Sequence, residues 1–313
     1  MRRDLPLRTV AAFDHTRRRR RYQRLDKKAR AGILFVSPAL LFFLVFFLGP
    51  LCFAVYVSLH DWDMLSPITS MPFVGLDQYQ ELLTADPLFK KTLVNSFAFA
   101  LGNLVFLPPL SLAVALLLNS GVRWLSLWRT IFFTPVVTSA VAVAIIWAYI
   151  FDPTYGPLNA LLVNLHLPPQ SFLSSETEAM PCIILVSVWQ SLGYYAIIYL
   201  AGLQGIAQEH LDAARVDGAS RSQTFRYITL PLLNPTTLFV LVIITINALQ
   251  VFTPVFIMTN GGPVDNTRVV VLNIYDTAFT FLHMGKASAM AMILFAIIFV
   301  FSLGEVKLME RGR

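Results

Sequence analysis

The side chains that most often carry out catalysis are scattered along this 313-residue chain. A zinc site or an acid–base centre needs several such groups at ligand spacing. No Gly-x-Ser-x-Gly sequence, which places a nucleophilic serine on a sharp turn, is present. We therefore expect no enzyme here, and we interpret each histidine as an exposed loop residue. The five histidines fall in separate segments: His15, His60, His166, His210 and His283.

The sequence also lacks an obvious energy source of its own. The phosphate-binding loop Gly-x4-Gly-Lys-Ser/Thr is absent, because Gly285-Lys286 is followed by Ala287 and the earlier glycine is missing. Proton-driven transporters commonly place ionisable side chains within the membrane. No Asp, Glu, His, Lys or Arg lies well inside the apolar runs of this chain. If the protein moves a solute uphill, the energy has to come from a partner.

Long apolar runs indicate an all-α integral membrane protein. The chain is 56% hydrophobic and 13% charged, and a soluble domain carries about twice that charged fraction. A spanning helix needs about 20 residues to cross roughly 30 Å of hydrocarbon. Six runs approach or exceed this length, and we predict six transmembrane helices at approximately 33–59, 93–118, 130–151, 181–203, 234–258 and 287–304.

A polar island separates the fourth run from the fifth and is long enough for two short helices. The first is predicted from Gln208 to Val216 and ends at Asp217-Gly218, because glycine adopts the left-handed conformation at low cost. Ser220 followed by Gln223 has the capping-box spacing for a second helix, which Pro231 closes after about Leu230. The island is therefore predicted to be a helix–turn–helix outside the bilayer, with a plain solvated loop as the alternative.

The spacing of residues in this island resembles a known motif, E-A-A-x3-G-x9-I-x-L-P. This motif is typical of the cytoplasmic coupling loop of permeases in binding-protein-dependent ABC importers. Asp212 departs from the usual Glu but keeps the carboxylate, and Ala207 stands where many relatives have Pro. Turn segments elsewhere are similar to those of the carbohydrate-type branch, which is maltose- and glycerol-phosphate-like. The matching residues are Asp212, Ala213, Ala214, Gly218, Ile228, Leu230 and Pro231.

The resemblance implies the type I ABC importer permease fold. It implies a basic cytoplasmic tail over residues 1–32, a six-helix permease domain over 33–306 with its coupling loop at 204–232, and a short cytoplasmic tail over 307–313. Small alanines allow close approach to an ATPase, and carboxylates offer partners to its basic groups. The expected ATPase-coupling residues are Glu209, Asp212, Ala213, Ala214, Gly218, Ile228, Leu230 and Pro231.

The resemblance also implies partners. These are a second homologous permease subunit, two ATPase subunits, an extracytoplasmic solute-binding protein and membrane lipid. ATP and Mg would be bound by the partner ATPase, and this chain would hold no cofactor. Nucleic acid is not expected as a partner, because the basic residues of the tail directly precede a membrane span.

The distribution of basic residues predicts the orientation. With the N-terminus in the cytoplasm, 20 Lys and Arg residues fall inside and four fall outside. The opposite topology reverses this ratio. We therefore expect a multi-pass protein of the cell membrane with both termini and the polar island in the cytoplasm.

Uncharged polar residues recur within the fourth and fifth runs. Ser187, Gln190 and Tyr194 follow i, i+3, i+7 spacing, and Asn247, Gln250 and Pro254 repeat it, so each set is predicted to share one helix face. Amides and hydroxyls beside aromatic rings suit a neutral, polyhydroxylated solute. Interhelical hydrogen bonding is the alternative, and the partner permease is another place for the solute site. The expected pathway residues are Gln190, Tyr194, Asn247 and Gln250.

The predicted function is a permease subunit of an ATP-driven importer that forms half of the pathway for a sugar or related solute. A secondary transporter or facilitator of small neutral solutes is the first alternative. An integral membrane enzyme is the second, and the missing ionisable constellation disfavours it.

Overall fold

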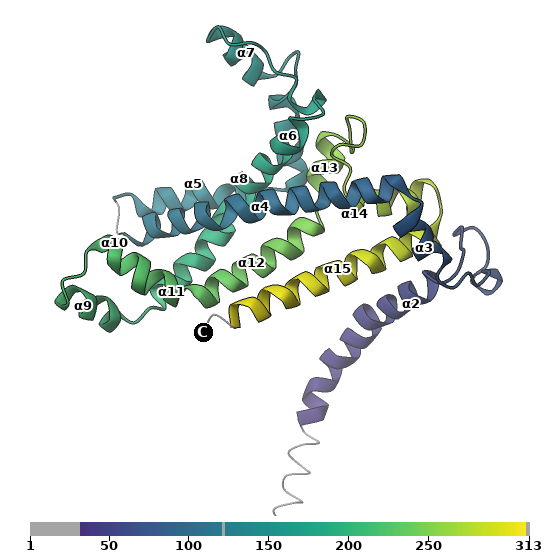
Figure 1. Cartoon of the computed structure of the whole chain (residues 1–313), viewed down its shortest axis with the longest axis horizontal. Coiled ribbons are helices and arrows are strands. Elements are labelled where there is room, and N and C mark those ends of the chain that lie inside the picture. The colour runs from purple at the N-terminus through teal and green to yellow at the C-terminus, as the bar shows by residue number, and fades with distance from the viewer. Residues whose placement is uncertain (1–31, 121–122, 311–313) are drawn as a thin grey trace, which may run out of the picture. The chain divides into compact units, whose positions relative to one another are not determined.

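The computed structural model describes residues 32–120 and 123–310, and it divides into two units, 1–56 and 57–313. The predicted basic tail lies outside the described residues except for Gly32, and so does the end of the predicted 307–313 tail. The first unit holds one apolar helix, Gly32–Val57, which matches the first predicted span (Figure 1). Within it, the π-helix η1 (Leu44–Leu48) precedes α2 (Gly49–Val57). Pro50 lacks the N–H that regular α-helical bonding requires, which explains a wider turn just before it.

Four long helices form the centre of the second unit. They are α4 (Pro87–Asn119), α8 (Ala179–Gln204), α12 (Asn234–Leu249) and α15 (Met284–Glu310). α4 packs against α8 and α12, and α12 packs against α15 (Figure 1). Each of these helices is long and apolar enough to cross a membrane, with α12 counted together with α13 (Thr253–Met258). The second, fourth, fifth and sixth predicted spans are thereby confirmed.

The third predicted span is not one helix. α5 (Leu125–Val137) and α6 (Ala140–Ile150) meet at an angle of 97°. Thr138 and Ser139 between them adopt extended backbone conformations, with ψ of 141° and 129°. A continuous apolar run therefore conceals a break that the sequence reading joined into a single span, and α6 projects away from the four long helices (Figure 1).

The fifth span is interrupted more gently. α12 ends at Leu249, and α13 restarts at Thr253 with Pro254 in its first turn. A proline is compatible with this position because the first residues of a helix have no intrahelical acceptor for their N–H groups. Gln250, the residue after Leu249, caps the C-terminal end of α12.

The remaining helices lie at the ends of the bundle. α9 (Gln208–Val216) and α10 (Arg221–Thr224) are at one end, and α3 (Asp77–Thr84) is at the other (Figure 1). α7 (Pro157–Asn164) follows α6. The shorter elements are η2 (Ile68–Ser70), η3 (Phe172–Ser174), η4 (Phe225–Thr229), α11 (Leu230–Leu232), α14 (Val270–Tyr275) and η5 (Asp276–Thr280).

Candidate functional site

The polar island folds as the predicted helix–turn–helix. α9 spans Gln208–Val216, as the sequence predicts, and Gly218 follows with a left-handed φ of +76°. The Ser220 hydroxyl accepts a hydrogen bond from the Gln223 backbone N–H at 3.3 Å, and the Gln223 side-chain oxygen accepts one from the Ser220 N–H at 2.8 Å. Both halves of the capping box are present, so the start of α10 is fixed by local chemistry.

The end of the second helix differs from the prediction. Pro231 does not close it, because the backbone continues through the π-helix η4 into α11 and reaches Leu232. The N–H of Leu230 donates to the Phe225 carbonyl, five residues earlier. Pro231 has no N–H for the carbonyl four residues before it, and the wider π turn accommodates that loss. Only Leu233, which is fully buried, separates this helix from α12.

The exposed side of α9 carries three of the eight predicted coupling residues. Glu209, Asp212, Ala213 and Val216 stand at i, i+3, i+4 and i+7, which places them on one helix face. All four are exposed, and Val216 is 86% exposed despite being apolar. We call these four residues the α9 face. It combines two carboxylates with one small and one apolar side chain, which suits contact with another protein.

Two predicted coupling residues on α9 have partners within the chain. Asp212 accepts hydrogen bonds from Arg215 at 2.9 Å and from Gln208 at 3.2 Å. The ion pair with Arg215 is solvent-exposed on both sides, so it stabilises the helix by less than about 1 kcal/mol and leaves the carboxylate free to exchange partners. Ala214 is only 4% exposed. Its small side chain is buried within this chain, and a role for the Ala213-Ala214 pair in coupling stays a prediction.

Among the predicted coupling residues of the second helix, one is half-buried and two are exposed. Ile228 and Phe225, three residues apart, are both half-buried, while Leu230 and Pro231 are exposed. Tyr227 is 69% exposed, and the Arg226 guanidinium lies 5.9 Å from the centre of its ring. The sequence reading did not single out Val216 or Tyr227, although an apolar side chain within a polar island is a visible signal.

The predicted pathway residues of α8 do not share one environment. The Ser187 hydroxyl donates to the Asn103 side chain of α4 at 3.0 Å. The Gln190 amide donates to the Thr138 carbonyl at 3.4 Å, at the break between α5 and α6. Tyr194 is exposed and packs edge-on against Tyr195. The three residues of the predicted polar face therefore have different neighbours.

The predicted residues of the fifth span lie close to α8. The exposed Asn247 side chain donates to the Tyr195 hydroxyl at 3.3 Å, which joins α12 to α8. Gln250 is exposed where α12 ends. A role for Gln190, Tyr194, Asn247 and Gln250 in a solute pathway stays a prediction.

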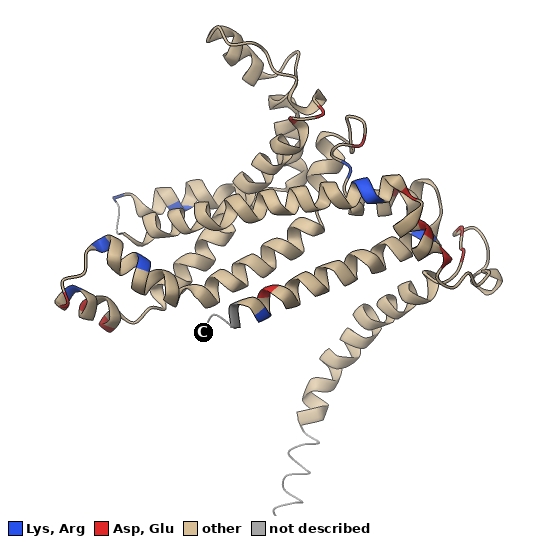
Figure 2. Ribbon diagram, viewed as in Figure 1, with Lys and Arg blue, Asp and Glu red and all other residues tan. Residues whose placement is uncertain are grey.

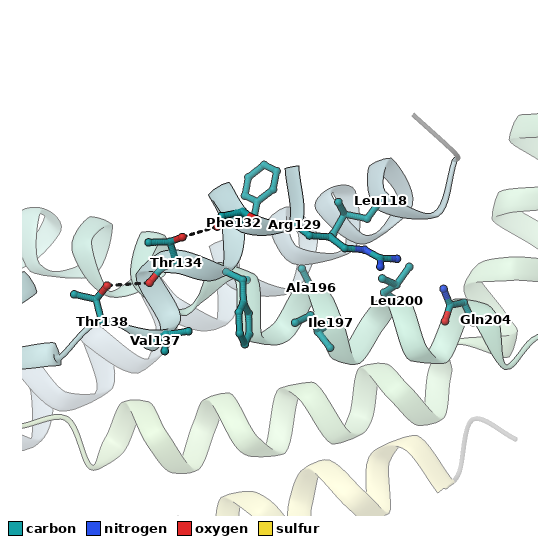
Figure 3. A pocket seen from close by; sticks show the side chains of 13 residues that line it. Leu118, Arg129, Phe132, Thr134, Val137, Thr138, Ala196, Ile197, Leu200 and Gln204 are labelled. Carbon is teal, nitrogen blue, oxygen red and sulfur yellow. Dashed lines mark hydrogen bonds between the residues drawn. The ribbon is translucent and has the colours of Figure 1, made fainter. Parts of the chain in front are cut away.

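A groove between α5 and α8 was missed by the sequence reading. It has a volume of about 770 Å³, and its polar lining comprises Arg129, Gln204 and a threonine ladder, Thr130, Thr134 and Thr138. Figure 3 shows Arg129, Thr134, Thr138 and Gln204 along it. Each hydroxyl donates to the carbonyl four residues earlier, at 2.7–3.0 Å. Because their protons are used in this way, the threonines present only acceptor lone pairs to the groove. Their i, i+4, i+8 spacing in the third apolar run is the signal that identifies them.

The same three threonines line a second cavity of about 490 Å³, which is walled by aromatic rings. Trp147 and Trp189 meet edge to face there, with ring centroids 5.5 Å apart. Hydroxyl acceptors beside indole rings form a surface suited to a neutral molecule with many hydroxyl groups.

Gly193 makes this arrangement possible. A Cβ atom at Gly193 would lie 2.0 Å from the Phe132 carbonyl oxygen of α5. Only glycine therefore allows the backbones of α5 and α8 to come this close, and small residues commonly serve that purpose between membrane helices.

Within the described residues, the Glu305 carboxylate contacts a membrane helix just beyond the predicted end of the sixth run. α15 continues past the predicted end of the sixth run, and Glu305 accepts a hydrogen bond of 2.6 Å from the buried Thr245 of α12. Its second oxygen and the Ser302 hydroxyl are buried without a hydrogen-bond partner among the described residues. Glu305 lies one residue beyond the predicted run 287–304, and the packing of α15 on α12 brings it to Thr245.

Comparison with known proteins gives consistent similarities. Residues 108–306 match the family described as "Binding-protein-dependent transport system inner membrane component". A probable ABC transporter permease protein of Bacillus subtilis, YesP, is 36% identical over 278 residues, covering 88% of each chain. The trehalose/maltose transport system permease protein MalF of Thermococcus litoralis is 32% identical, covering 90% of this chain and 94% of its own.

The fold is similar to that of solved transporters. The crystal structure of a bacterial ABC transporter involved in the import of the acidic polysaccharide alginate contains a chain that matches with a TM-score of 0.80 and 24% identity. The match covers 93% of this chain and 99% of that one. At this identity the similarity describes the fold alone.

Proposed function

Because this chain belongs to the family of inner membrane components of binding-protein-dependent transport systems, we propose that its α9–α10 element docks on a separate ATPase while its membrane helices form half of a sugar pathway. The chain is a transmembrane permease subunit of an ABC importer with the type I permease fold. The proposal adds the residues that couple this chain to the ATPase, the class of solute that it carries and its orientation in the membrane.

The observation that carries the proposal is the exposed α9 face on an element that runs almost without interruption into α12. A displacement of α9 and α10 would be passed to the membrane helix α12 through η4, α11 and the buried Leu233. A flexible loop would dissipate such a displacement, whereas consecutive helical turns transmit it as rigid-body motion. The ATPase would bind ATP and Mg, and closure of two ATPase subunits would rock this chain against a second, homologous permease.

A carbohydrate-type solute is proposed from the groove and from the relatives. The cavity beside α6 offers three threonine hydroxyls and two tryptophan rings, and no charged side chain lines it. Sugar hydroxyls can donate to the threonine oxygens, and the apolar faces of a sugar ring can stack on indole. The Thermococcus litoralis relative is named for trehalose and maltose transport.

The orientation is proposed from the basic residues. Figure 2 shows Lys and Arg at α9, α10 and the start of α5, and a second group among acidic residues at the α3 end. Counted over the whole sequence in the predicted topology, 20 Lys and Arg residues fall on the α9 side and four on the α3 side. The positive-inside tendency then places α9 and α10 in the cytoplasm and α3 outside. A solute-binding protein would accordingly meet the chain at the α3 end.

Uptake measurements test the proposed function directly. Cells that contain the transporter should accumulate radiolabelled di- or oligosaccharide, and accumulation should stop when ATP is depleted while the ion gradient is clamped. Continued accumulation under those conditions would instead identify a secondary transporter. Failure to accumulate any neutral sugar, with uptake of another solute, would remove the carbohydrate assignment alone.

Cysteine labelling tests the orientation. A membrane-impermeant reagent should label cysteines introduced near Asp77, Ser174 and Asn266 in sealed cells, and it should miss those at Ser120 and Ser220. Labelling of Ser220→Cys from outside would overturn the cytoplasmic placement of the α9–α10 element.

A further inference from the structure

A polar cavity lies at the α3 end of the bundle, remote from the threonine groove and from α9. It has a volume of about 370 Å³ and lies between α3, the segment before it and the start of α15. We call it the acidic cavity. It is lined by Asp61, Val74, Asp77, Gln78, Glu81, His283 and Lys286.

The charge of the acidic cavity is not balanced by the residues that the structure describes. The Lys286 ammonium is held by Glu81 at 2.8 Å and by Asp86 at 2.9 Å, so its charge is compensated. Burial raises the pKa of the Asp86 carboxyl, but hydrogen bonds from the Phe89 N–H and from Lys286 outweigh it and hold that pKa below its ordinary value. Asp61 and Asp77 are exposed, and neither forms an ion pair within the described part of the chain. The cavity therefore has surplus negative charge.

A buried amide supplies a second, independent sign of a missing ligand. Gln78 is only 8% exposed, and its Nε2 donates to the His60 carbonyl at 3.0 Å. Its Oε1 has no hydrogen-bond partner among the described residues. A buried acceptor without a donor is uncommon and costs free energy. Gln78 lines the acidic cavity, so this buried acceptor without a partner belongs to the wall of the cavity.

The chemistry of the cavity favours an organic cation over a metal ion. In the described ranges, 32–120 and 123–310, no three His, Cys, Asp or Glu side chains are close enough to hold a metal. Acceptors dominate the lining, with two unpaired carboxylates and the Gln78 oxygen. An arginine guanidinium carries five N–H donors in a plane and is suited to several acceptors at once.

We propose that the acidic cavity receives an arginine side chain of the solute-binding protein, which docks at the α3 end and places the guanidinium between Asp61 and Asp77. This inference rests on the proposed function, which puts α3 on the extracytoplasmic side. The contact joins opposite charges at an interface, so it accelerates docking and makes it sensitive to salt.

The test uses the complete transporter in lipid nanodiscs with its purified, solute-loaded binding protein. The quantity measured is the binding-protein concentration that gives half-maximal stimulation of ATP hydrolysis. The double variant Asp61→Asn/Asp77→Asn should raise this concentration by about tenfold, leave the maximal rate unchanged and weaken its dependence on salt. Asp77→Arg should raise it further. Glu176→Gln, which removes an exposed charge away from the cavity, is the matched control and should behave as wild type.

Exchanging charges between the binding protein and the transporter identifies the group that occupies the acidic cavity. One Arg→Glu variant of the binding protein should fail to stimulate ATP hydrolysis by the wild-type transporter. The same variant should stimulate the Asp77→Arg transporter. If wild type responds to the binding protein but the double variant is indistinguishable from Glu176→Gln, the inference is overturned. If free arginine or Ca²⁺ stabilises the transporter through the cavity while binding-protein affinity is unchanged, a small ligand is the occupant and the inference is again overturned. Absence of any stimulation of wild type would count against the proposed function instead.

Discussion

The α9–α10 connection and the α5–α6 break are positioned by different kinds of interaction. The connection is fixed by rules that act over a few residues: a left-handed glycine and a reciprocal cap at Ser220 and Gln223. The break at Thr138 depends on contacts with a distant helix, including Gln190 and the close approach at Gly193. The two regions also differ in form, because one is a short exposed helix and the other borders a cavity lined by hydroxyls and indole rings.

The largest expected effect comes from filling the contact between α5 and α8. Gly193→Val places side-chain atoms against the Phe132 carbonyl, which forces the helices apart and should lower the free energy of unfolding by about 3 kcal/mol or more. Thermal unfolding in detergent and the yield of monodisperse protein measure this. The control is Gly304→Ala in α15, where a Cβ atom would meet nothing within 4 Å. Equal losses in both variants would show that the close approach has no special role.

A smaller effect on folding but a large one on transport is expected from Ala213→Asp. The substitution adds a third carboxylate to the α9 face, where close approach would leave it desolvated and unpaired. Initial uptake should fall by about tenfold or more, and ATPase co-purification should weaken, with membrane insertion unchanged. Ser222→Asp adds the same charge in the first turn of α10, where the helix dipole favours it, and should transport normally. Uptake by Ala213→Asp at the level of Ser222→Asp would contradict the assignment of the α9 face.

The threonine ladder should influence solute affinity moderately. Thr134→Val keeps the shape of the groove but removes one acceptor, so the solute concentration for half-maximal uptake should rise by about fivefold, which corresponds to roughly 1 kcal/mol for one hydrogen bond. Thr134→Ser restores the hydroxyl and should restore affinity. An unchanged half-maximal concentration in Thr134→Val across a panel of sugars would remove the groove from the pathway.

The smallest effects are expected at Gln190 and Asn247. Their hydrogen bonds to Thr138 and Tyr195 are interhelical contacts, each worth about 0.6 kcal/mol in a membrane. Alanine at either position should change apparent affinity or solute range by about threefold while ATPase assembly survives. Normal transport of every solute by both variants would make these residues packing contacts only.

These differences show what the sequence could reveal. The long helices were predictable from the length of the apolar runs. The end of α9 was predictable because Gly218 adopts the left-handed conformation. The continuation of the second helix past Pro231 was missed, because a proline that ends an α-helix can also be accommodated by a π turn. Glu305 and the threonine groove were missed because their meaning depends on which helix packs opposite them.

The polar residues of α8 show the same limit. Regular spacing placed Ser187, Gln190 and Tyr194 on one face, but a face of a helix borders several neighbours in a bundle. Ser187 meets α4, Gln190 meets the α5–α6 break, and Tyr194 is exposed. Periodicity identifies the direction in which side chains point, and tertiary packing decides what they contact.

The central claim, that α9 and α10 form a shaped element that couples to an ATPase, is tested most directly at Gly218. A Cβ atom there would meet nothing within 4 Å, so a substitution acts on the left-handed backbone alone. Asparagine tolerates this conformation, whereas a β-branched valine resists it by about 1–2 kcal/mol. The measurement is ATPase retained on affinity-purified permease, taken together with sugar uptake in the same cells. The account predicts near-wild-type values for Gly218→Asn and loss of both for Gly218→Val, and normal retention and uptake in Gly218→Val would contradict it.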